Sequence, residues 1–95
     1  MSVIVKLFAN FREAMGKGSV EVEDVKNVGE LIEKLILLKG KLAREFYYPE
    51  TKEFVKSIQI MVNGKRVKIP EDLEKPLKSG DEVAIFPPVA GGAAL

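Results

Sequence analysis

The sequence near the N-terminus reads Val3-Ile4-Val5-Lys6-Leu7-Phe8-Ala9, and this stretch decides the fold. A short run that is rich in β-branched and aromatic residues predicts a strand. Because the run is almost continuously apolar, we expect it to lie centrally in a sheet, covered on both faces for part of its length. Residues 82–86 form a second apolar strand near the other end of the chain. Their shared apolarity predicts that the first and last strands are neighbours at the centre of the sheet.

A β-hairpin is predicted at the N-terminus. Residues 20–23 read Val-Glu-Val-Glu, and this alternation of apolar and acidic side chains is typical of a half-buried strand. Residues 11–18 contain two glycines and are predicted to be the hairpin connection between the two strands.

A second hairpin is predicted in the C-terminal half. The strand of residues 57–62 carries Ile58, Ile60 and Val62 on one face. Asn63-Gly64 is the preferred dipeptide of a type I′ turn, and it returns the chain into a strand over residues 66–69.

A helix is predicted between the two hairpins. Asn27 and Glu30 have the spacing of a capping box, which satisfies free N–H groups at a helix start. An apolar stripe follows, formed by Val28, Leu31, Ile32, Leu35, Leu38 and Leu42. We expect the helix to end near Gly40 or to continue raggedly toward Phe46. The stripe suits a partner-binding face or a core face, and we favour the core because the N-terminal hairpin needs a cover.

Two irregular segments complete the chain within the domain. Residues 47–53 contain a proline and many charges and are predicted to be a loop. Tyr47 and Tyr48 at its start suit stacking on a ligand, but we expect them to pack at the margin of the core. Residues 70–76 are predicted to be a short connection, with Leu73 and Leu77 as its anchors.

The order of elements is therefore strand, strand, helix, strand, strand, connection, strand. This order predicts an α+β protein of the β-grasp type, in which one main helix packs across one face of a mixed five-stranded sheet. Residues 1–86 are expected to form this domain, and residues 87–95 an extended, flexible C-terminal tail.

The composition excludes several kinds of chemistry. The chain has 95 residues, enough for one domain, with 46% hydrophobic and 31% charged residues and a mean hydropathy of +0.03. Its 15 basic and 14 acidic side chains give a net charge of +1, which argues against a nucleic-acid partner. Cysteine and histidine are both absent. Disulfides, a thiolate nucleophile, a histidine base and a Cys/His zinc site are therefore excluded.

Targeting signals are not found in the sequence. The first six residues lack a basic segment, a long apolar run and a cleavage site. The run at residues 35–38 is far shorter than the roughly 18–20 residues that span a bilayer. We therefore expect a cytoplasmic protein without a membrane partner.

Three side-chain or backbone patterns suggest chemistry, and simpler explanations are preferred for each. Glu21 and Glu23 share a strand face as a glycosidase pair would, but exposed acids on an alternating strand are usually solvated charge. Lys65, Arg66 and Lys68 suit a phosphate or RNA contact, but hairpin solubility explains them better. The Gly-Gly pair at residues 91–92 lacks the strand-to-helix context of a phosphate-binding loop.

The C-terminal segment has an unusual composition. It reads Phe86-Pro87-Pro88-Val89-Ala90-Gly91-Gly92-Ala93-Ala94-Leu95. Prolines favour an extended arm, and glycines permit a close approach that a Cβ would obstruct. Such a segment suits insertion into a narrow channel of another protein, and the same composition also suits a disordered chain end.

The same segment resembles the small, sulfur-carrier subunit of molybdopterin synthase (MoaD type), a ubiquitin-like family. The resemblance is carried by Gly80-Asp81-Glu82-Val83-Ala84-Ile85-Phe86-Pro87-Pro88-Val89-Ala90-Gly91-Gly92, preceded by Leu77. Residues 6–13 resemble its first strand and the following turn, and Val62-Asn63 the end of its middle strand. The likeness extends through Gly92 and implies the β-grasp fold independently.

The resemblance implies a non-catalytic carrier that depends on partner proteins. An E1-like adenylating enzyme would activate Gly92 with ATP, and sulfide would convert it into a thiocarboxylate. The large synthase subunit would then use this sulfur to build the dithiolene of the molybdenum or tungsten cofactor. The chain itself would bind no cofactor, because the partner enzymes use the ATP and sulfide. Gly91 would give steric clearance, and Pro87 and Pro88 would set the direction in which the arm leaves the domain.

The resemblance also implies a partner interface. Phe8 and Phe86 occupy two positions of the family's apolar patch, although ordinary core packing explains them equally well. A third patch position, often aliphatic in relatives, is Arg66 here. Members of the family usually end at the second glycine, whereas Ala93-Ala94-Leu95 follow here and lock Gly92 in a peptide bond. We expect a protease to remove these three residues, or a cloning junction to have added them, rather than a relative that has lost sulfur carriage.

Three functions compete at this point. The first is sulfur carriage for molybdopterin, which the Phe-Pro-Pro-Val run favours over thiazole or transfer-RNA sulfur carriage. The second is a protein modifier, in which the same activated glycine is joined to lysines of target proteins. The third is an adaptor that uses only its sheet, and Gly91-Gly92 argues against it.

Overall fold

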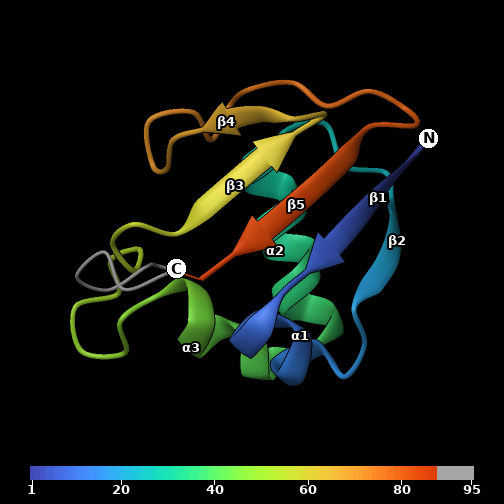
Figure 1. Ribbon diagram of the computed structural model, residues 1–95. Coiled ribbons are helices and arrows are strands. Elements are labelled where there is room, and N and C mark those ends of the chain that lie inside the picture. The colour runs from blue at the N-terminus through green and yellow to red at the C-terminus, as the bar shows by residue number, and fades with distance from the viewer. Residues whose placement is uncertain (88–95) are drawn as a thin grey trace.

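A five-stranded mixed sheet with helices on one side forms the domain (Figure 1). The computed structural model describes residues 1–87 of the chain. The strands are ordered β2-β1-β5-β3-β4. In Figure 1 the helices lie behind and below the sheet, and its other face is uncovered by the described residues. The elements are β1 (Ser2–Leu7), α1 (Ala9–Met15), β2 (Ser19–Glu23), α2 (Val28–Leu38), η1 (Gly40–Leu42), α3 (Ala43–Phe46), β3 (Gln59–Val62), β4 (Lys65–Val67) and β5 (Glu82–Phe86).

The first and last strands are neighbours, as their apolarity predicts. β5 is the middle strand of the sheet, and β1 pairs with it in parallel, with Val5 opposite Val83 and Leu7 opposite Ile85. All four of these side chains are buried. β3 pairs with the other edge of β5 in the antiparallel sense. The predicted β-grasp arrangement is therefore confirmed.

The predicted connection over residues 11–18 is wrong, because most of it belongs to helix α1. Phe11 and Met15, four residues apart, turn toward the core and are buried. The two glycines were taken as hairpin residues, but Gly16 ends the helix instead. Its φ of +90° is left-handed, and its N–H donates to the carbonyl of Arg12 at 2.9 Å.

Helix α2 begins as its capping signal predicts. Asn27 Oδ1 accepts a hydrogen bond from the Glu30 N–H at 2.8 Å, and the Glu30 carboxylate accepts one from the Lys26 N–H at 2.8 Å. The carboxylate thus reaches one residue before the cap rather than the cap itself.

The apolar stripe of α2 is buried except at its end. Val28, Leu31, Ile32 and Leu35 face the core, but Leu38 is 50% exposed and its predicted place in the stripe is wrong. The chain turns to an extended conformation at Lys39, so the stripe does not continue along one axis. The short helices η1 and α3 then bury Leu42 and Phe46 separately.

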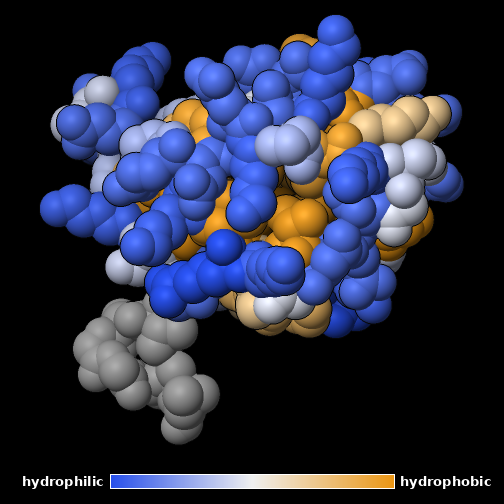
Figure 2. All heavy atoms as spheres, turned by 90° about the horizontal axis from the view of Figure 1, so that it is seen from above, coloured by the Kyte–Doolittle hydropathy of each residue, from blue (hydrophilic) through white to orange (hydrophobic). Residues whose placement is uncertain are grey.

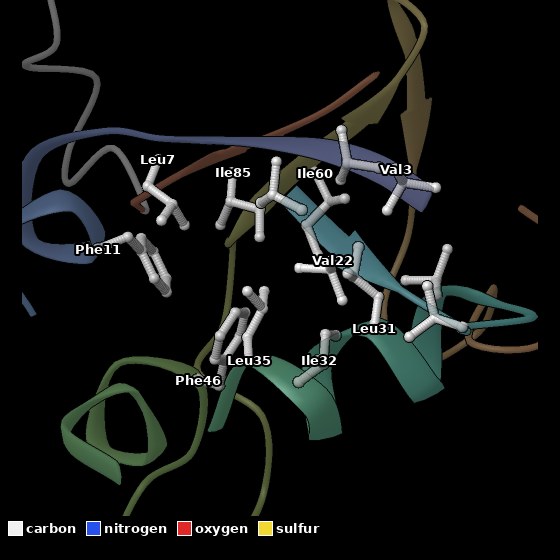
Figure 3. Close-up of a cluster of buried hydrophobic side chains, with 14 of the residues drawn as sticks. Val3, Leu7, Phe11, Val22, Leu31, Ile32, Leu35, Phe46, Ile60 and Ile85 are labelled. Carbon is white, nitrogen blue, oxygen red and sulfur yellow. The ribbon is translucent and has the colours of Figure 1, made fainter. Parts of the chain in front are cut away.

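The core fills the space between the sheet and the helices. Figure 3 shows Leu31, Ile32 and Leu35 of α2 facing the sheet residues, with Phe11 and Phe46 closing one end. The rings of Phe11 and Phe46 lie 5.0 Å apart in a tilted arrangement. The predicted anchors of the 70–76 connection also pack here, since Leu77 is buried and Leu73 is partly buried against the core.

The predicted type I′ turn is confirmed, because Asn63 and Gly64 have φ values of 52° and 82°. The flanking strands, however, are shorter than predicted. Asn63 also ties this hairpin to the start of β5: its Nδ2 donates to Asp81 Oδ1 at 2.8 Å, and its Oδ1 accepts from the Glu82 N–H at 2.9 Å. Asp81 in turn accepts from the Lys78 N–H at 2.8 Å.

These bonds predict a pH-dependent contribution from Asp81. The Lys78 N–H, followed by the Asn63 side chain, lowers the pKa of the Asp81 carboxyl. A lowered folded-state pKa means that the ionised form stabilises the fold above the unfolded pKa of about 3.9, and that this contribution is lost as the pH falls through the folded pKa. We expect Asp81→Asn to unfold at lower urea concentration than wild type at neutral pH, with the gap narrowing below about pH 4. A gap that is unchanged in acid would contradict this role.

Candidate functional site

The uncovered side of the sheet, called here the outer face, is defined by alternate strand residues. Val3, Val5 and Leu7 of β1 are buried toward α2, so the intervening Ile4 and Lys6 point to the other side. The pairing register extends this face across the sheet. It comprises Glu21 and Glu23 of β2, Ile4 and Lys6 of β1, Glu82, Ala84 and Phe86 of β5, Met61 of β3 and Arg66 of β4.

Phe8 and Phe86 form an aromatic stack at one end of the outer face. Their ring centroids lie 4.4 Å apart and the planes differ by 9°. Phe8 follows β1, and its N–H donates to the Ile85 carbonyl at 3.2 Å, which holds it beside the last turn of β5. Phe8 is 38% exposed, and neither ring belongs to the buried core. The core-packing explanation for these two residues is therefore wrong.

Arg66 lies on the same outer face, two strands away from Phe86. It is exposed and stands opposite Met61, which in turn stands opposite Ala84. Within residues 1–87 the ion pair found is Lys6 with Glu82, whose Nζ and Oε2 atoms lie 3.4 Å apart. Arg66 takes no part in it.

Sequence reasoning missed Met61 and Ala84, which are half-buried and connect the aromatic stack to Arg66. Both could be found from period-two alternation, because Met61 lies between the inward-facing Ile60 and Val62. Ala84 likewise lies between Val83 and Ile85. The missing information was the register that brings the two strands together.

Pro87 follows Phe86 directly and is the last residue that the structure describes. In the final rung of the sheet Phe86 stands opposite Gln59, and Pro87 has no N–H with which to extend the pairing. The other predicted tail residues, Pro88, Gly91, Gly92 and residues 93–95, lie outside the described residues. The expected tail over residues 87–95 therefore stays a prediction.

The outer face is built for binding rather than for side-chain catalysis. Glu21, one member of the candidate acid pair, accepts a hydrogen bond from the Ser2 hydroxyl at 2.7 Å and is exposed. No group of three or more acidic side chains within residues 1–87 could hold a metal ion. In the same residues no helix has the length and apolar character needed to cross a membrane.

A hollow beside α3 contains the two tyrosines. It is lined by Ala43, Arg44, Tyr47, Tyr48, Pro49 and Lys52. Tyr47 packs on Phe54 with the ring centroids 4.6 Å apart, which confirms its expected place at the core margin. Burial, and then the nearby charge of Glu33, raise the pKa of Tyr47. The Tyr48 hydroxyl accepts a hydrogen bond from the Lys56 N–H at 3.2 Å.

A β-grasp domain whose central strand leads directly into a Pro-Pro and then a Gly-Gly sequence defines a class, the small ubiquitin-like sulfur carriers. A family model described as the ThiS family matches residues 5–92, and the chain belongs to this family. Sulfur carriers of the ThiS family are non-catalytic small proteins.

Similar proteins span nearly the whole chain. Small archaeal modifier protein 3 of Haloferax volcanii is 33% identical over 94 residues, covering 97% of this chain and all of that one. The molybdopterin synthase sulfur carrier subunit of Dictyostelium discoideum is 30% identical over 91 residues, 93% of each chain. The crystal structure of SAMP1 from Haloferax volcanii matches with a TM-score of 0.81 at 30% identity, covering 97% of this chain and 100% of that one.

Proposed function

We propose that this protein is the sulfur carrier of molybdopterin biosynthesis, the non-catalytic small subunit of molybdopterin synthase acting in the cytoplasm. The observation that carries the proposal is the course of β5. This central strand ends at Phe86 and runs directly into Pro87, six residues before Gly92. A reactive main-chain carboxylate is thus attached to the most rigid part of the sheet, which fits a chain without cysteine or histidine.

The chemistry would proceed at Gly92 in two steps. A carboxylate oxygen attacks the α-phosphorus of ATP in the E1-like enzyme, giving an acyl adenylate and releasing pyrophosphate. Sulfide then attacks the acyl carbon and displaces AMP, which leaves a thiocarboxylate. Both steps need a free carboxylate, so residues from Ala93 onward must be removed first. The large synthase subunit would take the sulfur for the dithiolene.

The outer face would hold the partners during these steps. Phe8 and Phe86 present a flat aromatic surface at the point where the chain leaves the sheet. Arg66 lies on the same face. Pro87 and Pro88 would stiffen the arm, and Gly91 would let the backbone enter a narrow channel.

Protein modification is the second candidate function, and two comparisons favour it. Both Haloferax volcanii proteins that the chain resembles bear the name or title of archaeal modifiers. The two functions share adenylation of Gly92 and differ in what attacks the acyl carbon, sulfide in one and a lysine amine in the other.

Intact mass measurement separates these functions. A chain ending at Gly92 is incubated with its adenylating enzyme, ATP and a sulfide source. We expect a mass gain of about 16 Da, the difference between sulfur and oxygen, because sulfide replaces one carboxylate oxygen. The sulfur-loaded chain should then restore molybdopterin formation when mixed with the large subunit. An unchanged mass, accompanied in cells by lysine-linked conjugates, would instead favour the modifier.

A further inference from the structure

We propose that the outer face selects its adenylating enzyme by charge polarity. The enzyme would present carboxylates opposite Arg66 on β4 and cations opposite Glu21 and Glu23 on β2. This inference rests on the proposed function and adds the chemistry of the partner surface. It makes Arg66 a specificity-determining residue rather than a replaced member of an apolar patch.

The β2 edge of the outer face is acidic. Glu21 stands opposite Ile4 and Glu23 opposite Ser2, so both carboxylates lie on the side of the sheet away from α2. Both are exposed. The Ser2 hydroxyl bonds to Glu21 without neutralising its charge.

The β4 edge of the outer face is basic. Figure 2, which views the molecule from above the β4 edge, shows hydrophilic side chains gathered there around small apolar areas. The register places Arg66 opposite Met61 on the outer face. Its chain neighbour Lys65 stands opposite the buried Val62 and so belongs to the other side of β4. Arg66 forms no ion pair with any residue in 1–87.

The centre of the outer face is apolar or internally neutralised. Met61, Ala84 and the Phe8–Phe86 stack occupy it, and its two charges, Lys6 and Glu82, pair with each other. The face is therefore negative at one edge and positive at the other, with an apolar band between them. Complementary charges at such a rim raise the association rate and exclude wrong partners, while the desolvated aromatic centre supplies affinity.

Chain length identifies the occupant. Six residues separate Phe86 from Gly92, and an extended chain covers about 3.3–3.6 Å per residue, so Gly92 reaches at most about 20 Å beyond the sheet. Any enzyme that holds Gly92 in its site must contact this end of the domain, where the described residues leave the outer face uncovered. Adenylation precedes both sulfur carriage and protein modification, so the adenylating enzyme is the partner that either function requires.

Charge reversal tests the polarity. The dissociation constant of the chain ending at Gly92 and its adenylating enzyme is measured at low and at high salt. We expect Arg66→Glu to raise it at least about tenfold at low salt, because like charges would then meet. The Glu21→Lys/Glu23→Lys double variant should weaken binding likewise. Both differences should shrink at high salt, where exposed charges are screened.

Lys65→Glu is the matched control, since it makes the same charge change on the other side of the same strand. It should change the dissociation constant less than about twofold, as expected for a charge remote from the interface. Equal effects of Arg66→Glu and Lys65→Glu would overturn the proposal and leave the proposed function intact. A wild-type chain that is neither bound nor adenylated would overturn the proposed function and this inference together.

A second copy of the chain is the competing occupant. A copy turned about an axis along β5 would also place its acidic β2 edge over the basic β4 edge. Sedimentation of the free protein distinguishes the two. A monomer whose enzyme binding depends on Arg66 supports the proposal. A dimer that Arg66→Glu dissociates, with enzyme binding unchanged, would assign the face to self-association and overturn it.

Discussion

Replacing Gly92 with alanine in a chain ending at that residue is expected to reduce thiocarboxylate formation at least about a hundredfold, because a misplacement of about 1 Å at a reacting centre has effects of this size. The variant keeps the carboxylate that is adenylated, and the change adds only a methyl group. That group would fill the space through which the backbone approaches the partner's channel, and it restricts φ where glycine is free. Single-turnover assays followed by intact mass measure the loss.

Gly40→Ala is the control for this substitution. Gly40 begins η1, and an added Cβ there would meet no atom within 4 Å. It should leave both the transfer rate and thermal unfolding at their wild-type values. Gly92→Ala should likewise unfold at the wild-type temperature, because Gly92 lies beyond the end of β5. A lower unfolding temperature for Gly92→Ala would mean that the segment packs against the domain, contrary to the carrier proposal.

The parts of the fold that the sequence predicts are those with local signals. Asn27 with Glu30, and Asn63 with Gly64, determine their cap and turn through atoms at most three residues apart. Helix α1 has no such signal, because its seven residues are too few to be stable alone. It is held by the burial of Phe11 against Phe46 of α3, a contact that single-sequence periodicity does not show.

The candidate site divides along the same line. Phe8 and Phe86 come from opposite ends of the chain and meet only because β1 and β5 pair in parallel. The sequence predicts that pairing from shared apolarity, but not the register that adds Met61 and Ala84 to the same face. The role of Gly92 follows from resemblance alone, since a glycine has no side chain from which chemistry could be inferred.

A matched pair of phenylalanine substitutions should separate folding from partner binding. Phe11→Ala is expected to lower the free energy of unfolding by about 3–5 kcal/mol, because a fully buried ring leaves a cavity. This is a large share of the roughly 5–15 kcal/mol typical of a domain. Phe8→Ala, three residues earlier, removes a 38% exposed ring and one stacking contact, and should cost no more than about 1.5 kcal/mol.

Partner binding should show the reverse order. Phe8→Ala removes half of the aromatic stack from the outer face, so its dissociation constant for the adenylating enzyme should rise at least about tenfold, as for an interface hot spot. Phe11→Leu restores most of the buried volume and should bind like wild type at temperatures where it is folded, because Phe11 faces the core and not the partner. Urea unfolding and calorimetric titration of the three variants measure both quantities. If Phe8→Ala destabilised the domain as much as Phe11→Ala and bound the enzyme normally, the stack would be part of the core, and the partner surface would have to lie elsewhere on the sheet.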